Sequence, residues 1–357
     1  MLILDGSYGE GGGQILRTAL TLSAITGQPM HIERIRAGRK NPGLQPQHLT
    51  AVRAASAICG AQLEGDEPGS QALTFIPGSP ARPGEYVFDV AEAARGGSAG
   101  SVGLVLQTVL LPLALQQEKS HLTLRGGTHV PWAPSVFYLN HVFLPVMTRM
   151  GLQVQIELVQ WGFYPAGGGE IQVQIKGKGT VLHPIQLTDR GELRRVWGTA
   201  AVMNLPAHIP QRMAARARNV LEEAGIRAQV EPRRLRGAGP GAGIFLFAEY
   251  ESTAGCVSAG FAAYGHKGLP SERVAEAACN ELLAHHRSGN PVDPHLADQL
   301  VLPMLAARGT SRISTSQISR HLLTNVWVSR QFLPQDVDVG GEQGAAGTLV
   351  AKGAEHD

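Results

Sequence analysis

The chain has 357 residues, with 31 Lys or Arg against 29 Asp or Glu, so its formal net charge is only +2. This length suits two domains, or one large domain that carries an insertion. The near-balance of charge excludes a protein that coats polyanions over its whole surface, so any contact with nucleic acid must be local. The basic run 34–40 is the candidate, although charge alone fits a solvated loop equally well.

Three further features exclude other classes of protein. The cysteines, Cys59, Cys256 and Cys279, are far apart and lack C-x-x-C spacing, which argues against a disulfide framework or a thiolate zinc site. The chain starts without the basic and apolar segments of a signal peptide. Its longest apolar run, 102–115, is shorter than the ~18 residues that a membrane span needs and reads as a buried helix. We expect a cytoplasmic protein with no membrane partner.

The order of predicted elements repeats along the chain. Residues 1–78 read as strand, helix, strand, helix, strand, with a glycine turn before the first helix, and residues 97–177 repeat that order. A third copy, helix, strand, helix, lies in 293–334, where Asp293 can cap the first helix. The hundred or so residues between the second and third copies have strands and helices of their own.

These patterns predict an α/β (α+β) fold. The expected large domain covers 1–183 and 283–340 and consists of three repeated βαβαβ-like units, each a sheet with two helices. A smaller α/β domain, 184–282, is inserted into it, and 341–357 form a C-terminal tail. Because turns of different copies then surround shared clefts, a site built from all three units is expected.

The glycine turn "GEGGGQ", 9–14, lies between a strand and a helix, where backbone N–H groups can face an anion. It lacks the lysine of a P-loop. A dinucleotide-binding turn is an alternative, because Glu33 follows about 20 residues later, but Gln14 stands where the third small residue belongs. A purely structural turn also remains open. Arg17 lies one turn into the helix, and Arg36 and Arg39 end the next strand, so all three can converge on a phosphate.

Two later segments carry candidate polar side chains. In "HLADQLVL", helical spacing puts His295, Asp298 and Gln299 on one face, which also fits the solvated side of an amphipathic helix. Ser319 can cap the last helix and leave His321 in its first turn. A helix N-terminus disfavours imidazolium and attracts phosphate, so His321 suits a nucleophile that attacks phosphorus. A packed or exposed bystander is the alternative for His321.

Seven stretches together resemble the RNA 3′-terminal phosphate cyclases. They are "LDGSYGEGGGQILRTALTLS", "IRAGRKNPGLQPQHLTAV", "GSAGSVGLVLQTVLLP", "GFYPAGGGE", "HKGLPSERV", "ADQLVLPMLAARG" and "HLLTNVWV". They follow the family's order over most of the chain, and agreement is weakest around 185–260. The resemblance implies a domain of three βαβαβ-like units with a small inserted α/β domain, as the repeat also predicts.

The resemblance also implies a reaction. With ATP and a divalent cation, Mg or Mn, such an enzyme converts an RNA 3′-phosphate end into a 2′,3′-cyclic phosphodiester and releases AMP and diphosphate. His321 would be the nucleophile that forms a histidine–AMP adduct, a case of covalent catalysis. The AMP would pass to the RNA 3′-phosphate, and the neighbouring 2′-OH would displace it. The implied class is a ligase that forms phosphoric ester bonds in RNA processing or repair.

Further residues are assigned by the same motifs. Glu10 matches the acidic residue near the metal, and the phosphate-facing matches are Arg17, Arg39, Gln47 and His48. The ATP-binding matches are Gln107, His295, Leu296, Ala297, Asp298 and Gln299. Pro134 would face the adenine opposite His295, which replaces a tyrosine found in many bacterial members and stacks less extensively.

The main alternative is a non-catalytic cyclase-like protein of ribosome biogenesis. Those relatives lack the "HLLTN"-type histidine, whereas this chain keeps His321 together with Glu10 and the arginines. An NAD-dependent oxidoreductase is a more distant alternative. The expected partners are RNA 3′-phosphate ends and ATP, and a homodimer is the candidate assembly.

Overall fold

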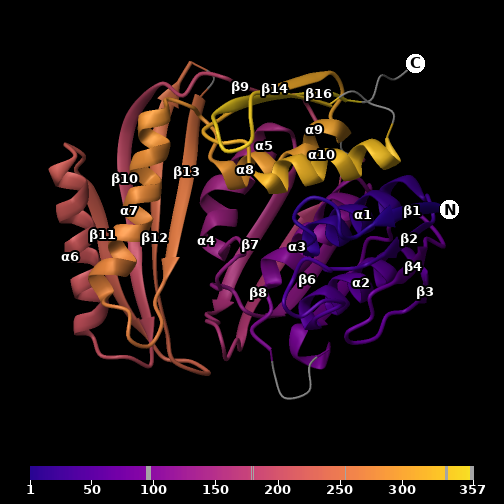
Figure 1. The fold of residues 1–357 in the computed structure, drawn as a ribbon, viewed down its shortest axis with the longest axis horizontal. Coiled ribbons are helices and arrows are strands. Elements are labelled where there is room, and N and C mark those ends of the chain that lie inside the picture. Colours follow the sequence, from indigo (N-terminus) through magenta and orange to yellow (C-terminus); the bar gives the residue numbers. More distant parts are fainter. Residues whose placement is uncertain (94–97, 178, 180, 254, 334–336, 354–357) are drawn as a thin grey trace.

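The computed structural model describes residues 1–93, 98–177, 179, 181–253, 255–333 and 337–353. In this part of the chain the fold is mixed α/β, with four sheets of four strands each (Figure 1). Residue 97 at the start of the second copy, and residues 178 and 180 just after its end, lie outside the described residues.

The first unit forms a sheet of order β1-β2-β4-β3 covered by two helices. Its elements are β1 (Leu2–Asp5), α1 (Gly13–Thr26), β2 (Met30–Glu33), α2 (Pro46–Cys59), β3 (Gln62–Glu64) and β4 (Leu73–Ile76). β1 and β2 are parallel, while β4 is antiparallel to both β2 and β3. Gly60 ends α2 in the left-handed conformation with φ +62, as expected of a C-terminal glycine.

The second unit repeats this topology in the order β5-β6-β8-β7. Its strands are β5 (Glu85–Asp89), β6 (Lys119–Gly126), β7 (Gln153–Gln160) and β8 (Gly169–Lys176). Its helices are η1 (Val90–Ala93), the buried α3 (Val102–Ala114), α4 (Val136–Tyr138), η2 (Leu139–Phe143) and α5 (Leu144–Arg149). The repeat predicts a single helix after β6, but this helix contains a π-helical segment, η2, between α4 and α5. Pro145, in the first turn of α5, explains the irregularity because proline has no N–H to donate to the preceding helical turn.

The third unit has the same strand arrangement, although its strands come from distant parts of the chain. β9 (Gln186–Leu187) is parallel to β14 (Thr310–Thr315), and β16 (Gly347–Lys352) is antiparallel to both β14 and β15 (Val337–Gly340). Its helices are α8 (Pro294–Gln299), α9 (Val301–Ala306) and α10 (Arg320–Phe332). The three units therefore share one topology, as the sequence repeat predicts.

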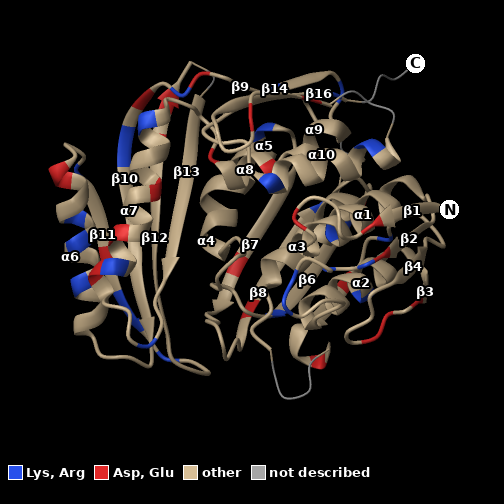
Figure 2. Ribbon diagram, in the orientation of Figure 1, with Lys and Arg blue, Asp and Glu red and all other residues tan. Residues whose placement is uncertain are grey.

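The inserted segment forms the fourth sheet, of order β11-β10-β12-β13. Its elements are β10 (Glu192–Met203), α6 (His208–Glu223), β11 (Ala228–Leu235), β12 (Gly241–Ser252), β13 (Gly255–Tyr264) and α7 (Ser271–Ser288). One face of this sheet and the two helices share a hydrophobic cluster, while Phe245 and Phe247 on the other face join the core of the three units. Figure 2 shows that much of the charge of this segment lies along α6, β10 and α7.

The elements do not break at the expected domain boundaries. β9 follows residue 184 but belongs to the third unit's sheet, and α7 continues past residue 282 to Ser288. The expected tail, 341–357, contains β16, which is paired on both of its edges. Sequence patterns missed these points because β9 is very short and β16 follows a glycine-rich turn, so neither carries a strong periodicity.

Two further observations concern the cysteines and the helices. The three cysteines are free, with Cys59 and Cys279 buried and Cys256 exposed. None of the helices in the described part of the chain combines the length and apolar character that a bilayer span requires.

A cluster of aromatic rings joins the second unit to the inserted sheet. His129 stacks on Trp161 with ring centroids 4.1 Å apart and meets Phe245 of β12 edge-on at 4.9 Å. Its Nδ1 contacts the hydroxyl of Thr128 at 2.8 Å, while its buried Nε2 has no partner among the described residues. Burial without an acidic neighbour lowers the pKa of His129 to about 3.

This histidine should make the fold sensitive to acid. Because the pKa of His129 is lower in the folded state than its ordinary value near 6.5, its stabilising effect is complete above pH 6.5 and is lost as the pH falls toward 3. Between pH 7 and pH 4 we expect the wild type to lose about 3 kcal/mol more unfolding free energy than His129→Phe, which does not titrate. Urea titrations of both proteins at the two pH values measure the difference, and equal losses would contradict the assignment.

Candidate functional site

The glycine turn between β1 and α1 brings the first and third units together. Gly9 and Gly11 have φ of +58 and +54, a left-handed conformation that suits glycine. A Cβ on Gly9 would lie 2.5 Å from the Oγ1 of Thr324 in α10, so the turn packs directly on that helix. The turn therefore has a tertiary role, because it packs the first unit on the third.

His321 lies at this junction. Ser319 caps α10 by accepting a hydrogen bond from the N–H of Leu322, as the sequence predicts, and His321 follows in the first turn. Its Nε2 is 3.1 Å from Oε2 of Glu10, and the same oxygen accepts a 2.8 Å hydrogen bond from Arg39. Side-chain exposure is 8% for Glu10 but 46% for His321. The imidazole is therefore open to a ligand while the carboxylate beneath it is sheltered.

The surroundings favour a neutral imidazole on His321. Partial burial lowers the pKa of His321; Glu10 opposes the shift, and Arg17 and Arg39 reinforce it. Burial, assisted by the nearby arginines, also holds the pKa of His48 well below its usual value. Both rings are thus mainly neutral at neutral pH. Nδ1 of His48 already accepts a hydrogen bond from the N–H of Gln45 at the start of α2.

Arg17 and His48 meet over the start of α1. A Cβ placed on Gly13 would lie 2.3 Å from Nε2 of His48 and 2.9 Å from Nη1 of Arg17. Desolvation, partly offset by Glu10 and Asp298, lowers the pKa of Arg17 to about 10, so the guanidinium is still charged at neutral pH. Glu10, Arg17, Arg39, His48 and His321 therefore surround one glycine turn, and we call them the reaction centre.

Adding one methyl group at Gly13 should displace this centre. Gly13→Ala would push its Cβ against His48, and over-packing of this kind costs about 1–3 kcal/mol. We expect Gly13→Ala to have a lower unfolding free energy than the wild type. We also expect a lower rate for any reaction that depends on these five residues. Gly84→Ala is the control, because its Cβ would meet only the Tyr86 ring at an ordinary 3.6 Å. Wild-type behaviour of Gly13→Ala in thermal unfolding and catalytic assays would refute the close packing.

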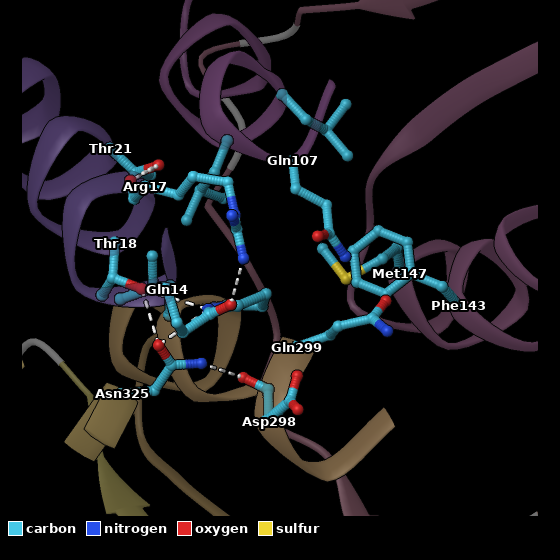
Figure 3. Close-up of a pocket in the computed structure, with 14 residues that line it drawn as sticks. Gln14, Arg17, Thr18, Thr21, Gln107, Phe143, Met147, Asp298, Gln299 and Asn325 are labelled. Carbon is cyan, nitrogen blue, oxygen red and sulfur yellow. Dashed lines mark hydrogen bonds between the residues drawn. The ribbon is translucent and has the colours of Figure 1, made fainter. Parts of the chain in front are cut away.

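A polar pocket adjoins the reaction centre (Figure 3). Arg17, Gln107 and Gln299 extend toward the same space from α1, α3 and α8. A hydrogen-bond chain fixes one wall, since Arg17 donates to Gln14 at 2.7 Å and Gln14 donates to Asn325 at 2.9 Å. The apolar side includes Phe143, Met147, Leu302 and Pro303.

Asp298 and Gln299 give this pocket its chemical character. Desolvation, with a contribution from buried Asp293, holds the pKa of Asp298 well above its usual value, although Arg17 acts against the shift. The amide of Asn325 donates to the backbone oxygen of Asp298 at 2.9 Å and fixes this end of α8. The buried Oε1 of Gln299 has no protein partner in the described structure and can accept a hydrogen bond from a ligand.

The structure separates the other predicted residues from this group. Gln47 accepts a 3.0 Å hydrogen bond from the N–H of Ser101 at the start of α3. Pro134 lies in the loop before α4, where its carbonyl oxygen approaches Gly103. His295 is exposed at the start of α8, with its ring centroid 6.3 Å from that of Tyr138. Leu296 and Ala297 are fully buried, so neither residue is exposed to a ligand in this structure.

Sequence reasoning assigned no ligand-binding role to two residues of the pocket wall, Gln14 and Asn325. Gln14 entered only as a departure from a dinucleotide-binding turn, yet its amide links Arg17 to Asn325. Asn325 lies one helical turn after His321 and is almost fully buried, a position at which an amide requires partners. The position of Asn325, a polar residue on the apolar side of its helix, was the sequence signal that could have identified it.

The described residues contain no group of three or more His, Cys, Asp or Glu side chains arranged to hold a metal ion. Glu10 is the carboxylate closest to His321, and it already contacts Arg39. This donor set fits a cation such as Mg²⁺ only if most ligands come from water and substrate phosphates, which is the usual mode of Mg²⁺ at nucleotide sites.

The fold and site define a mixed α/β protein of three like units with a charged centre where the first and third units meet. The family model described as RNA 3′-terminal phosphate cyclase matches residues 8–339, and the chain belongs to that family. An RNA 3′-terminal phosphate cyclase of a Nostoc species is 55% identical over 333 residues, covering 93% of this chain and 94% of its own. The proteins of that name from Methylococcus capsulatus and Pyrobaculum neutrophilum are 53% and 43% identical, over 95% and 93% of this chain and 93% and 92% of theirs.

Proposed function

We propose that this protein uses ATP to convert an RNA 3′-terminal phosphate into a 2′,3′-cyclic phosphodiester. The observation that carries the proposal is the placement of His321, exposed at a helix N-terminus and 3.1 Å from sheltered Glu10, with two arginines beside them. Family membership and the names of the relatives favour a catalytic protein over a non-catalytic one. An NAD-dependent oxidoreductase gains no support from either.

In the first step His321 attacks the α-phosphorus of ATP, a nitrogen–phosphorus bond forms, and diphosphate leaves. The lowered pKa of His321 supplies the neutral imidazole that such an attack needs. If Nε2 is the attacking atom, its contact with Glu10 must open when the phosphate arrives. Arg17 and Arg39 neutralise charge on the phosphates, and the N-terminus of α10 adds its positive dipole end.

In the second step an oxygen of the RNA 3′-phosphate attacks the phosphorus of the His321 adduct and releases the imidazole. This gives an RNA end joined through its phosphate to AMP. The 2′-hydroxyl of the same nucleotide then attacks the 3′-phosphorus, loses its proton, and displaces AMP. Proximity favours this last step because nucleophile and phosphorus belong to one ribose.

The polar pocket of Figure 3 would bind the nucleoside part of ATP. Gln107, Asp298 and Gln299 present amide and carboxyl groups, and the unpartnered Oε1 of Gln299 suits an N–H donor of the ligand. His295 and Pro134 would face the adenine from opposite sides. Glu10 would hold a divalent cation, Mg²⁺ or Mn²⁺, whose chemistry is to offset phosphate charge.

An oligoribonucleotide that ends in a 3′-phosphate tests the overall reaction. With ATP and Mg²⁺, its end should become resistant to phosphatase. The matched control has a 2′-deoxyribose at the last position and should stop at the adenylylated end, because it has no 2′-hydroxyl to displace AMP. That end also resists phosphatase, so release of AMP, expected from the ribose substrate alone, distinguishes the two. If the ribose substrate gains no resistance, the protein is one of the non-catalytic relatives and the proposal fails.

A further inference from the structure

A second cavity, of about 250 Å³, lies at the start of α2, separate from the pocket of Figure 3. Its walls come from residues 45–47, residues 98–100 with Leu104, the loop 130–133, and Tyr164. None of these residues lines the first pocket. The proposed reaction steps give this cavity no role, although Gln47 in its wall was predicted to face a phosphate.

Two exposed aromatic rings border the cavity. Trp132 is 94% exposed and Tyr164 is 61% exposed, which puts both among the few large apolar side chains left open to solvent. A single exposed aromatic is ordinary, but Trp132 also has φ of +61, a backbone conformation that bulky residues avoid. The loop thus exposes the indole of Trp132 to solvent beside the cavity. The backbone conformation that places it there is energetically unfavourable for a bulky residue.

Close backbone packing fixes the cavity walls. A Cβ on Gly167, beyond Tyr164 in the same hairpin, would lie 2.6 Å from the backbone oxygen of Ser98. A Cβ on Gly100 would lie 2.8 Å from Cβ of Gln47. The hairpin, the segment before α3 and the start of α2 are therefore in direct contact, so the cavity is formed before any ligand arrives.

The cavity adjoins the reaction centre on one side. Gln47 in its wall precedes His48, whose ring lies against Gly13 and Arg17. Gln45 donates from its side chain to the backbone oxygen of Pro42, in the loop whose carbonyl groups accept from Arg36. An RNA strand whose 3′ end lies at His321 would therefore run past the basic loop 34–40 toward the cavity.

The other side of the cavity leads to a basic part of the inserted segment. A Cβ on Gly168 would lie 2.5 Å from Cβ of Ala238, so the Tyr164 hairpin touches the loop after β11. Arg236 is two residues before Ala238, and Arg233 and Arg234 precede it in β11. Arg233 pairs with Glu231 at 3.1 Å, which leaves Arg234 and Arg236 as the arginines of this loop region without a carboxylate partner in the ion pairs of the described residues. Arginine-bearing loops thus neighbour the cavity on two sides and aromatic rings stand at its rim, a combination that suits single-stranded nucleic acid without sequence preference.

We propose that this cavity is an RNA subsite that receives a nucleobase on the 5′ side of the terminal, phosphate-bearing nucleotide, stacked against Trp132 and Tyr164. This inference rests on the proposed function for the position of the RNA end. Stacking on a base explains why the indole of Trp132 is exposed to solvent in the free protein. Base–aromatic stacking has little sequence preference, because every base has a π-face.

The test compares two short single-stranded RNAs of equal length, both ending in a 3′-phosphate. One carries all its bases, and the other is abasic except at the last nucleotide, so their phosphate charges are equal. Fluorescence anisotropy measures binding to the wild type, to Trp132→Ala and Tyr164→Ala, and to Val87→Ala, an exposed apolar residue on β5. The rate of protein–AMP formation from ATP alone is measured on the same proteins.

We expect Trp132→Ala to bind the full RNA roughly 5- to 100-fold more weakly, as the loss of one stacked base predicts. The abasic RNA should bind equally to all four proteins, Trp132→Phe should recover part of the affinity, and protein–AMP formation should not change. Equal binding of the full RNA by wild type and Trp132→Ala would overturn the proposal. Slower protein–AMP formation in Trp132→Ala would also overturn it and assign the cavity to ATP.

The two proposals can fail separately. If the wild type never forms a cyclic end but shows the stacking difference in anisotropy, the proposed reaction is wrong and the RNA subsite stands. If cyclisation occurs and Trp132 has no effect on RNA binding, the reaction stands and the subsite is wrong.

Discussion

Replacing His321 by alanine should abolish the transfer of AMP from ATP to the protein. The variant lacks the only protein atom that the proposed mechanism joins to phosphorus, and loss of a nucleophile lowers a rate on the order of 10⁴-fold or more. ATP labelled at the α-phosphate, incubated with the wild type and a divalent cation, should leave label on the chain through an acid-labile, base-stable bond. In His321→Ala the label should be absent.

His208→Ala is the matched control, because His208 is also exposed and also stands at the start of a helix, α6, in the inserted segment. It should keep full labelling. Labelled His321→Ala would show that another residue is the nucleophile, and the labelled peptide would then identify it. Because His321 is exposed at a capped helix start, its loss should leave the thermal unfolding temperature nearly unchanged.

Replacing Arg17 by glutamine should have the second-largest effect. The guanidinium is partly buried, hydrogen-bonded to Gln14 and oriented into the pocket beside the reaction centre (Figure 3). Loss of a desolvated charge from a phosphate site costs about 2–5 kcal/mol, which corresponds to roughly a 30-fold to several-thousand-fold loss in kcat/KM for ATP. Single-turnover measurements of protein–AMP formation over a range of ATP concentrations give this value.

Two further variants show whether the effect belongs to the phosphate site. Arg17→Lys keeps the charge but loses the forked donor, so it should recover only part of the rate. Arg53→Gln removes an arginine of α2 that pairs with Asp66 at the surface, and it should behave as the wild type. If Arg17→Gln also retains the wild-type rate, the phosphates of ATP lie elsewhere.

Local sequence signals predicted the repeat and the helix ends well. Asp293 caps α8 by accepting hydrogen bonds from the N–H groups of His295 and Leu296, and Ser319 caps α10. Such signals depend on a few neighbouring residues, so they can be recognised from the sequence alone. The strand expected to end at Arg36 and Arg39 instead stops at Glu33, since Arg34 and Arg36 adopt positive φ and turn the chain.

Long-range pairing was the part that sequence patterns could not supply. β9 has two residues and joins a sheet whose next strand lies more than a hundred residues later. Asp293 shows the same limit, because its carboxylate also accepts from the hydroxyl of Tyr138 and the N–H of Gly260, in two other parts of the fold. Neither partner has a fixed sequence offset that a motif could express.

The sequence by itself determined which residue types were available, that three units repeat, and which family the motifs resemble. Only the tertiary structure decided that Glu10 shelters beneath His321, that Asn325 closes a chain from Arg17 to α8, and that Trp132 and Tyr164 border one cavity. The physical reason is that helix caps and periodicity are local, whereas burial, pKa and hydrogen-bond partners depend on atoms that packing brings together from distant positions.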